Sequence, residues 1–179
     1  TLIELLVVLA IVVTLAAVAL GLFDGARASA AASRARIELA ALSQGLELYR
    51  QQFGDYPQAA DTPEKLLLAL TGQIGPSGAA ARGQNLLARL PVLLQFGVPP
   101  DVPGNCFVDP WGRAYEYVYF TRQDDGAPLR RGFVLYSLGD RSAAESLPTR
   151  AQVVPATSGH DGGAIASSPA NAKNIYADR

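Results

Sequence analysis

The sequence has no methionine, one histidine and one cysteine among its 179 residues. Cys106 has no second cysteine to pair with, which excludes an intramolecular disulfide, and we interpret it as a small core residue. The 15 lysines and arginines are matched by 16 acidic residues, so no basic excess indicates a nucleic-acid partner. Because methionine is absent and no charged stretch precedes the first apolar segment, we expect an N-terminus produced by trimming or by proteolysis.

Motifs for catalysis are missing as well. His160, the one histidine, lies in a tail of small and polar residues. Neither a Gly-x-Ser-x-Gly sequence nor a phosphate-binding loop occurs anywhere in the chain. We therefore interpret the segment around His160 as surface chain, and the sequence predicts that the protein is not an enzyme.

A long apolar segment dominates the start of the chain. From Leu5 to Phe23 every residue is apolar except Thr14. As a helix this segment would measure roughly 28 Å, which is close to the thickness of a bilayer's hydrocarbon core. A cleavable signal peptide would have a shorter apolar core that ends in a cleavage site. The segment therefore predicts a membrane span within residues 1–25.

The same helix is expected to continue far beyond the apolar segment. No proline occurs before Pro57, and residues 26–53 consist mainly of good helix formers. Gly54 is expected to end the helix, which would then be on the order of 75 Å long. The apolar residues of its second half recur every three or four positions and form one stripe, whereas the charged residues lie on other faces. The stripe consists of Leu39, Leu42, Leu46, Tyr49 and Phe53.

The rest of the chain predicts short elements joined by loops. A second helix is expected to begin at Thr62, with Pro63 at its first position, and to end near Leu70. Strands are expected at 114–120 and 132–137, where apolar and aromatic residues alternate or cluster. Weaker signals indicate a helical turn within 86–94 and a third strand at 151–154.

Together these elements predict an α+β fold. A long N-terminal helix, half transmembrane and half amphipathic, would pack on a small antiparallel sheet. The globular domain would span residues 26–154 and include the second half of the helix. Residues 155–179 have few large apolar side chains, so they predict a polar surface segment or a flexible tail.

The first eleven residues, TLIELLVVLAI, contain one charged side chain, that of Glu4. This sequence resembles the processed N-terminus of type IV pilins and type II secretion pseudopilins, which follows the prepilin peptidase cut. The first residue of that family, an N-methylated phenylalanine, is missing here, and Thr1 matches the second position. In that family the glutamate meets the N-terminal amine of a neighbouring subunit. The resemblance therefore implies an assembly role for Glu4 and Thr1.

Further motifs resemble the major pseudopilins and occur in the same order. By itself the DPWG motif predicts a turn, with Trp111 as a core anchor. The motifs are Leu48-Tyr49 with Gly54-Asp55-Tyr56-Pro57 at the end of the long helix, Asp109-Pro110-Trp111-Gly112 before the sheet, and Tyr136-Ser137-Leu138-Gly139-Asp140 after it. The resemblance implies the type IV pilin-like version of the α+β fold.

Two further expectations follow from the resemblance. Major pseudopilins bind calcium in the loop after the last of these motifs, where Asp140 and Glu145 are the candidate ligands and Arg141 opposes the site. Gly21 and Gly25 fall where many pilins place a residue that loosens the helix. Close packing between neighbouring helices is the alternative reading of both glycines.

The expected function is that of a structural subunit. It would polymerise into a type IV pilus-like or type II secretion pseudopilus filament through N-terminal helix packing. An extended type IV pilus subunit for adhesion, motility or DNA uptake is the alternative within this class, and a monomeric membrane-tethered binding domain or enzyme is the alternative outside it. Expected partners are copies of the same chain, prepilin peptidase and assembly-platform proteins, with no nucleic acid. We expect a single-pass inner-membrane protein before assembly and a periplasmic or extracellular filament afterwards.

Overall fold

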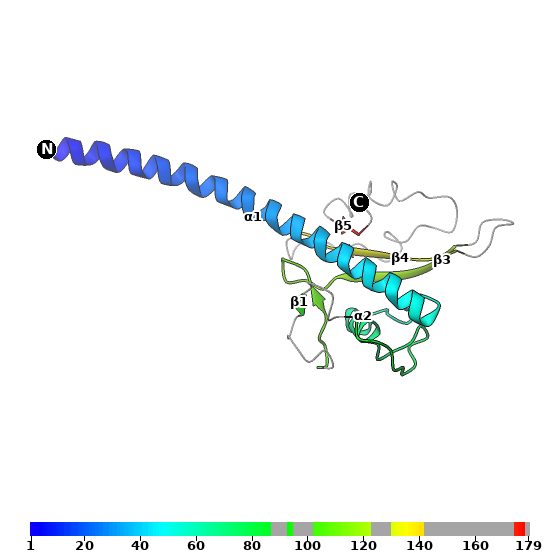
Figure 1. Ribbon diagram of the computed structural model, residues 1–179. Helices are drawn as coiled ribbons and strands as arrows, with labels where there is room; N and C mark the ends of the chain where they lie inside the picture. Colours follow the sequence, from blue (N-terminus) through cyan, green and yellow to red (C-terminus); the bar gives the residue numbers. More distant parts are fainter. Residues whose placement is uncertain (87–92, 95–101, 123–129, 142–173, 178–179) are drawn as a thin grey trace.

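The computed structural model describes residues 1–86, 93–94, 102–122, 130–141 and 174–177. For residues 17–24, 93, 122 and 130 it describes the backbone but not the side chains. The fold is α+β, as expected: a long N-terminal helix precedes a small antiparallel sheet (Figure 1). The elements are α1 (Leu2–Phe53), α2 (Pro63–Leu70), β1 (Leu93–Leu94), β2 (Phe107–Val108), β3 (Glu116–Arg122), β4 (Arg130–Ser137) and β5 (Ile175–Tyr176).

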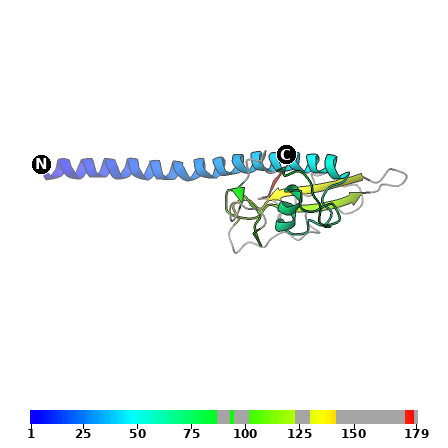
Figure 2. The same ribbon diagram turned by 60° about the horizontal axis from the view of Figure 1, so that its bottom comes forward.

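Helix α1 has the expected length and ends for the expected reason. Gly54 adopts a left-handed conformation with φ of 84°, and its N–H donates to the Arg50 carbonyl oxygen at 2.7 Å. Glycine tolerates this conformation at the end of a helix without a steric penalty. The first half of α1 extends away from the rest of the molecule, and the second half runs along the sheet (Figures 1 and 2).

The core lies between the second half of α1, α2 and the sheet. The predicted stripe on α1 is confirmed, because its first four members are fully buried and Phe53 packs against them. Helix α2 begins at its predicted position, with the Thr62 hydroxyl accepting a hydrogen bond from the Lys65 N–H at 3.4 Å. Its buried face and the sheet supply the rest of the core, including Leu66, Leu67, Leu70, Tyr115 and Leu135.

The sheet has the order β3-β4-β5, and all of its pairs are antiparallel. Strands β3 and β4 confirm the two predicted strands, with boundaries displaced by up to two residues. Their register runs from Glu116 opposite Tyr136 to Arg122 opposite Arg130. Strands β1 and β2 form a separate two-stranded pair. Cys106, directly before β2, is buried as expected.

Two local predictions are corrected. Residues 93–94 form strand β1 opposite β2 instead of ending a helical turn, because backbone pairing with Phe107–Val108 satisfies their polar groups. Residues 174–177 form part of the sheet and not of a flexible tail, because β5 pairs with the end of β4, with Ile175 opposite Ser137; they are half-buried at its surface. The strand predicted at 151–154 lies outside the described residues.

Candidate assembly interface

The first half of α1 exposes a continuous apolar surface. Its large apolar side chains between residues 2 and 15 are each between 53% and 78% exposed. They are Leu2, Ile3, Leu5, Leu6, Val7, Val8, Leu9, Ile11, Val12, Val13 and Leu15. Monomeric soluble proteins rarely expose apolar patches of this extent, and such patches mark interaction sites. We call these residues the apolar rod.

Thr1 and Glu4, the two predicted assembly residues, are in contact at the tip of this rod. The N-terminal amine of Thr1 forms an ion pair with Glu4 Oε2, and both side chains are exposed. Hydrogen bonds from the amine and from Thr1 lower the pKa of the Glu4 carboxyl below its ordinary value. Glu4 also lines a shallow apolar hollow of about 260 Å³ with Ile3, Val7 and Val8. A carboxylate thus lies beside apolar surface, where a partner would surround it.

The expected single-pass inner-membrane placement is corrected by the structure. Among the residues described, no helix combines the length and the apolar character needed to cross a membrane.

The two glycines of interest both lie inside α1. A Cβ atom placed on Gly25 would meet none of the described atoms within 4 Å, so no contact among the described residues requires glycine there. Gly21 belongs to the part of α1 whose side-chain surroundings are not described. Both readings of the pair, loosening of the helix and close packing between copies, therefore stay predictions.

The predicted turn at Asp109-Pro110-Trp111-Gly112 is present and is organised by its aspartate. Asp109 is buried; its Oδ1 accepts hydrogen bonds from the N–H groups of Trp111 at 3.0 Å and Arg113 at 2.9 Å. Its Oδ2 accepts from the Ser137 hydroxyl at 2.7 Å, which joins the turn to the end of β4. Pro110 and Trp111 are only half-buried, so the carboxylate, and not the indole, is the buried anchor of this turn.

One of the two candidate calcium ligands lies within the described residues. Asp140 is exposed, Arg141 beside it is buried, and Glu145 lies outside the described residues. Within the described part of the chain, no three histidine, cysteine, aspartate or glutamate side chains cluster as a metal site would require.

Glu38 is buried, although the charged residues in the second half of α1 were expected on faces away from the apolar stripe. It is 2% exposed and accepts hydrogen bonds from the Tyr115 hydroxyl and from Arg34 Nε, both at 2.7 Å. A sequence signal was present, because Glu38 lies three residues after Ala35 and four before Leu42, on the buried side of α1.

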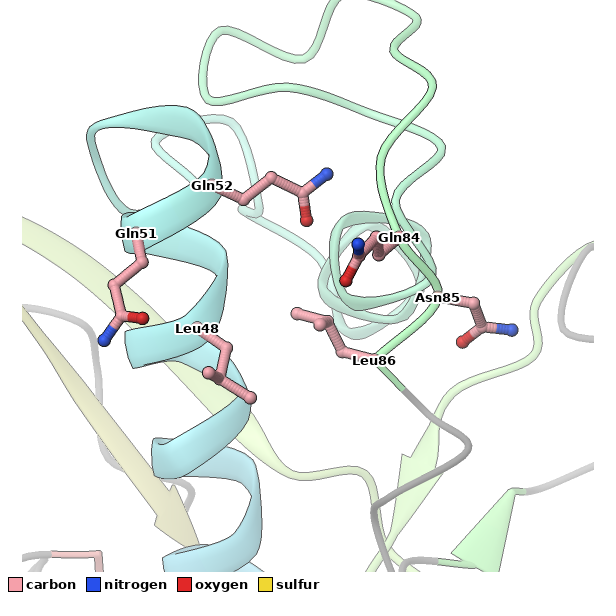
Figure 3. A pocket seen from close by; sticks show the side chains of 6 residues that line it. All are labelled: Leu48, Gln51, Gln52, Gln84, Asn85 and Leu86. Atoms are coloured by element: carbon pink, nitrogen blue, oxygen red, sulfur yellow. The ribbon is translucent and has the colours of Figure 1, made fainter.

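An open hollow of about 380 Å³ lies between the last turns of α1 and the loop after α2 (Figure 3). Leu48 and Leu86 point toward one another across it. The other lining residues all carry side-chain amides: Gln51, Gln52, Gln84 and Asn85. None of these groups titrates near neutral pH, so they supply no acid or base for catalysis.

No family model, curated protein or solved structure matches this chain.

Proposed function

We propose that this chain is a structural subunit that polymerises through its N-terminal helix into a type IV pilus-like or type II secretion pseudopilus filament. The observation that carries the proposal is the apolar rod, which extends from the globular part and is covered by none of the elements that the structure describes (Figure 2). The chain is similar to type IV pilins and pseudopilins in its first eleven residues and in the DPWG turn, which supports the same conclusion.

The free energy of burying apolar side chains favours a partner along the whole rod. Burial of one large aliphatic side chain contributes about 1.5–3 kcal/mol, so covering half of the rod contributes on the order of 10 kcal/mol. This is a sizeable part of the 4–15 kcal/mol that association costs in lost translational and rotational freedom, and several neighbours can cover the rod together. A helix that is apolar on all sides is suited to burial among several other helices.

Copies of the same chain are the occupants that this surface fits best. Among the described residues at the start of the rod, the charged groups are the Glu4 carboxylate and the Thr1 amine with which it pairs. In a single subunit the two groups pair with each other in water, where an ion pair contributes little. In a staggered stack of copies, the Glu4 carboxylate of one subunit would reach the amine of the next within an apolar surrounding. Such pairing fixes the axial register, because a shifted stack would leave a buried charge without a partner.

Electron microscopy of the full-length protein with its assembly partners tests the proposal. The native chain should form filaments, and Glu4→Gln should abolish them or reduce them sharply while leaving the globular fold intact. Asp61→Asn is the matched control, because it also removes one exposed carboxylate but lies outside the rod, directly before the N-cap of α2. A native protein that stays monomeric under these conditions, or a Glu4→Gln protein that assembles normally, would contradict the proposal.

A further inference from the structure

The hollow between the last turns of α1 and the loop after α2 has an apolar side and a polar side (Figure 3). Leu48 and Leu86 point toward one another on the apolar side, and the amides of Gln52 and Gln84 point toward one another on the polar side. Each side-chain amide offers two N–H donors and one acceptor oxygen. An apolar surface thus lies next to groups that both donate and accept hydrogen bonds.

The two walls of the hollow are held in place by the fold. The Tyr49 hydroxyl donates to the Ile74 carbonyl oxygen at 2.9 Å, which joins the last turns of α1 to the loop after α2. The Leu86 N–H donates to the Leu70 carbonyl oxygen at 3.0 Å, which joins the same loop to the end of α2. A site whose walls are fixed in this way loses little conformational entropy when it binds a ligand.

Gly83 allows the loop to lie directly against α1. A Cβ atom at this position would lie 2.5 Å from Gln52 Nε2 and 2.7 Å from the Phe53 ring. The missing side chain therefore leaves room for the Gln52 amide beside the loop backbone. This close approach places the Gln52 amide opposite Gln84, although both residues are exposed.

The chemistry of the lining residues indicates a ligand without net charge. The six described lining residues are leucines, glutamines and an asparagine, so they offer no counter-ion to a phosphate, carboxylate or ammonium group. Sugar hydroxyls donate and accept hydrogen bonds, as side-chain amides do, and the C–H face of a sugar ring is suited to leucine. The volume of about 380 Å³ lies within the range of small-molecule sites.

A peptide fits this hollow less well than a sugar. An extended peptide is commonly bound by backbone hydrogen bonds to the edge of a sheet. The lining residues of the hollow belong instead to a helix and to a loop. Their hydrogen-bonding groups are side-chain amides, which suit separate hydroxyl groups.

We propose that this hollow binds a short neutral saccharide through the amides of Gln52 and Gln84 and the apolar surfaces of Leu48 and Leu86. The hollow lies at the C-terminal end of α1, whereas the apolar rod lies at its N-terminal end. Saccharide binding and helix packing therefore use different parts of the same helix. The inference does not rest on the proposed filament.

An NMR titration of the isotope-labelled full-length protein tests the proposal, with maltose, cellobiose and lactose as probes. The detergent should have a zwitterionic headgroup, because a sugar headgroup would compete for the hollow. At millimolar concentrations, at least one probe should shift the side-chain amide resonances of Gln52 and Gln84 until they saturate. The absence of a saturable shift with all three probes, or saturable shifts only at other residues, would overturn the proposal.

Substitutions test the role of the two amides. Gln52→Ala and Gln84→Ala should each weaken binding roughly three- to tenfold, because each removes one hydrogen-bonding group. Gln44→Ala is the matched control, since it removes an exposed amide of α1 that does not line the hollow, and it should bind as the native chain does. All three residues are exposed, so the fold should persist in each variant. Equal affinity of the three variants would contradict the assignment.

Two further probes test the class of ligand. Glucuronic acid carries a carboxylate, and an alanine tripeptide with blocked ends supplies amide groups without a sugar ring. Stronger binding of either probe than of the neutral disaccharides would overturn the proposal. The Glu4→Gln protein should bind the disaccharides as the native chain does, so a failure of filament assembly and a failure of saccharide binding are distinguishable.

Discussion

The Tyr115 hydroxyl donates a hydrogen bond to Glu38 Oε2 at 2.7 Å, and both residues are buried. This bond joins the middle of α1 to the residue directly before β3. Arg34 supplies a charge at 2.7 Å from the other oxygen of the same carboxylate. A directional hydrogen bond of this kind specifies the position of the helix along the sheet. Apolar packing alone specifies that position less sharply.

Removing the Tyr115 hydroxyl should therefore destabilise the globular part. We expect Tyr115→Phe to lower the free energy of unfolding by about 1–3 kcal/mol, because a buried carboxylate loses one donor and nothing replaces it. Urea denaturation followed by circular dichroism measures the change. Tyr119→Phe is the matched control, since its hydroxyl lies 3.4 Å from Asp55 Oδ2 and is half-buried, so its loss should be smaller. Equal stability of the two variants would contradict this account.

A pH-dependent effect is expected at Glu116, the first residue of β3. Burial raises the pKa of the Glu116 carboxyl above its ordinary value of 4.5. A carboxyl with a raised pKa in the folded state favours folding below its unfolded pKa, and this contribution is lost as the pH rises through the folded pKa. At neutral pH the ionised side chain is therefore unfavourable to the fold.

Glu116→Gln should for this reason raise the Tm at neutral pH, and the gain should disappear near about pH 4, where the native carboxyl is protonated. Thermal unfolding of both proteins across this pH range gives the comparison. Asp61→Asn, at an exposed carboxylate, should show no such pH-dependent gain. A gain of the same size at both ends of the range would argue against ionisation as its cause.

Two glycine substitutions should have opposite effects. Gly72 has φ of 77°, and a Cβ there would lie 2.6 Å from the Gly83 carbonyl carbon, so Gly72→Ala should cost about 2–4 kcal/mol of stability. Gly25→Ala should instead favour the helix by up to about 1 kcal/mol, because a Cβ there meets no described atom within 4 Å and alanine is the better helix former. Urea denaturation measures the first effect, and amide exchange in α1 measures the second. A less stable helix in the Gly25→Ala protein would contradict the second expectation.

Features set by neighbouring residues were predictable from the sequence. The boundaries of α1 follow from the absence of proline and from Gly54, and the start of α2 follows from Thr62 and Pro63. The boundaries of β3 and β4 were less accurate, because a strand extends as far as its partner continues to pair. Strand β5 has two residues, and no local pattern distinguishes it from the polar chain around it.

The sequence by itself determined the long helix, its apolar first half and the buried stripe of its second half. These features depend on helix propensity and on a periodicity of 3.6 residues, both of which act over short distances along the chain. Only the tertiary structure decided that Glu38 and Arg141 are buried, although both residues are charged. Their partners, Tyr115 and Asn174, lie 77 and 33 residues away, and a charge is buried only where folding brings such partners within hydrogen-bonding distance.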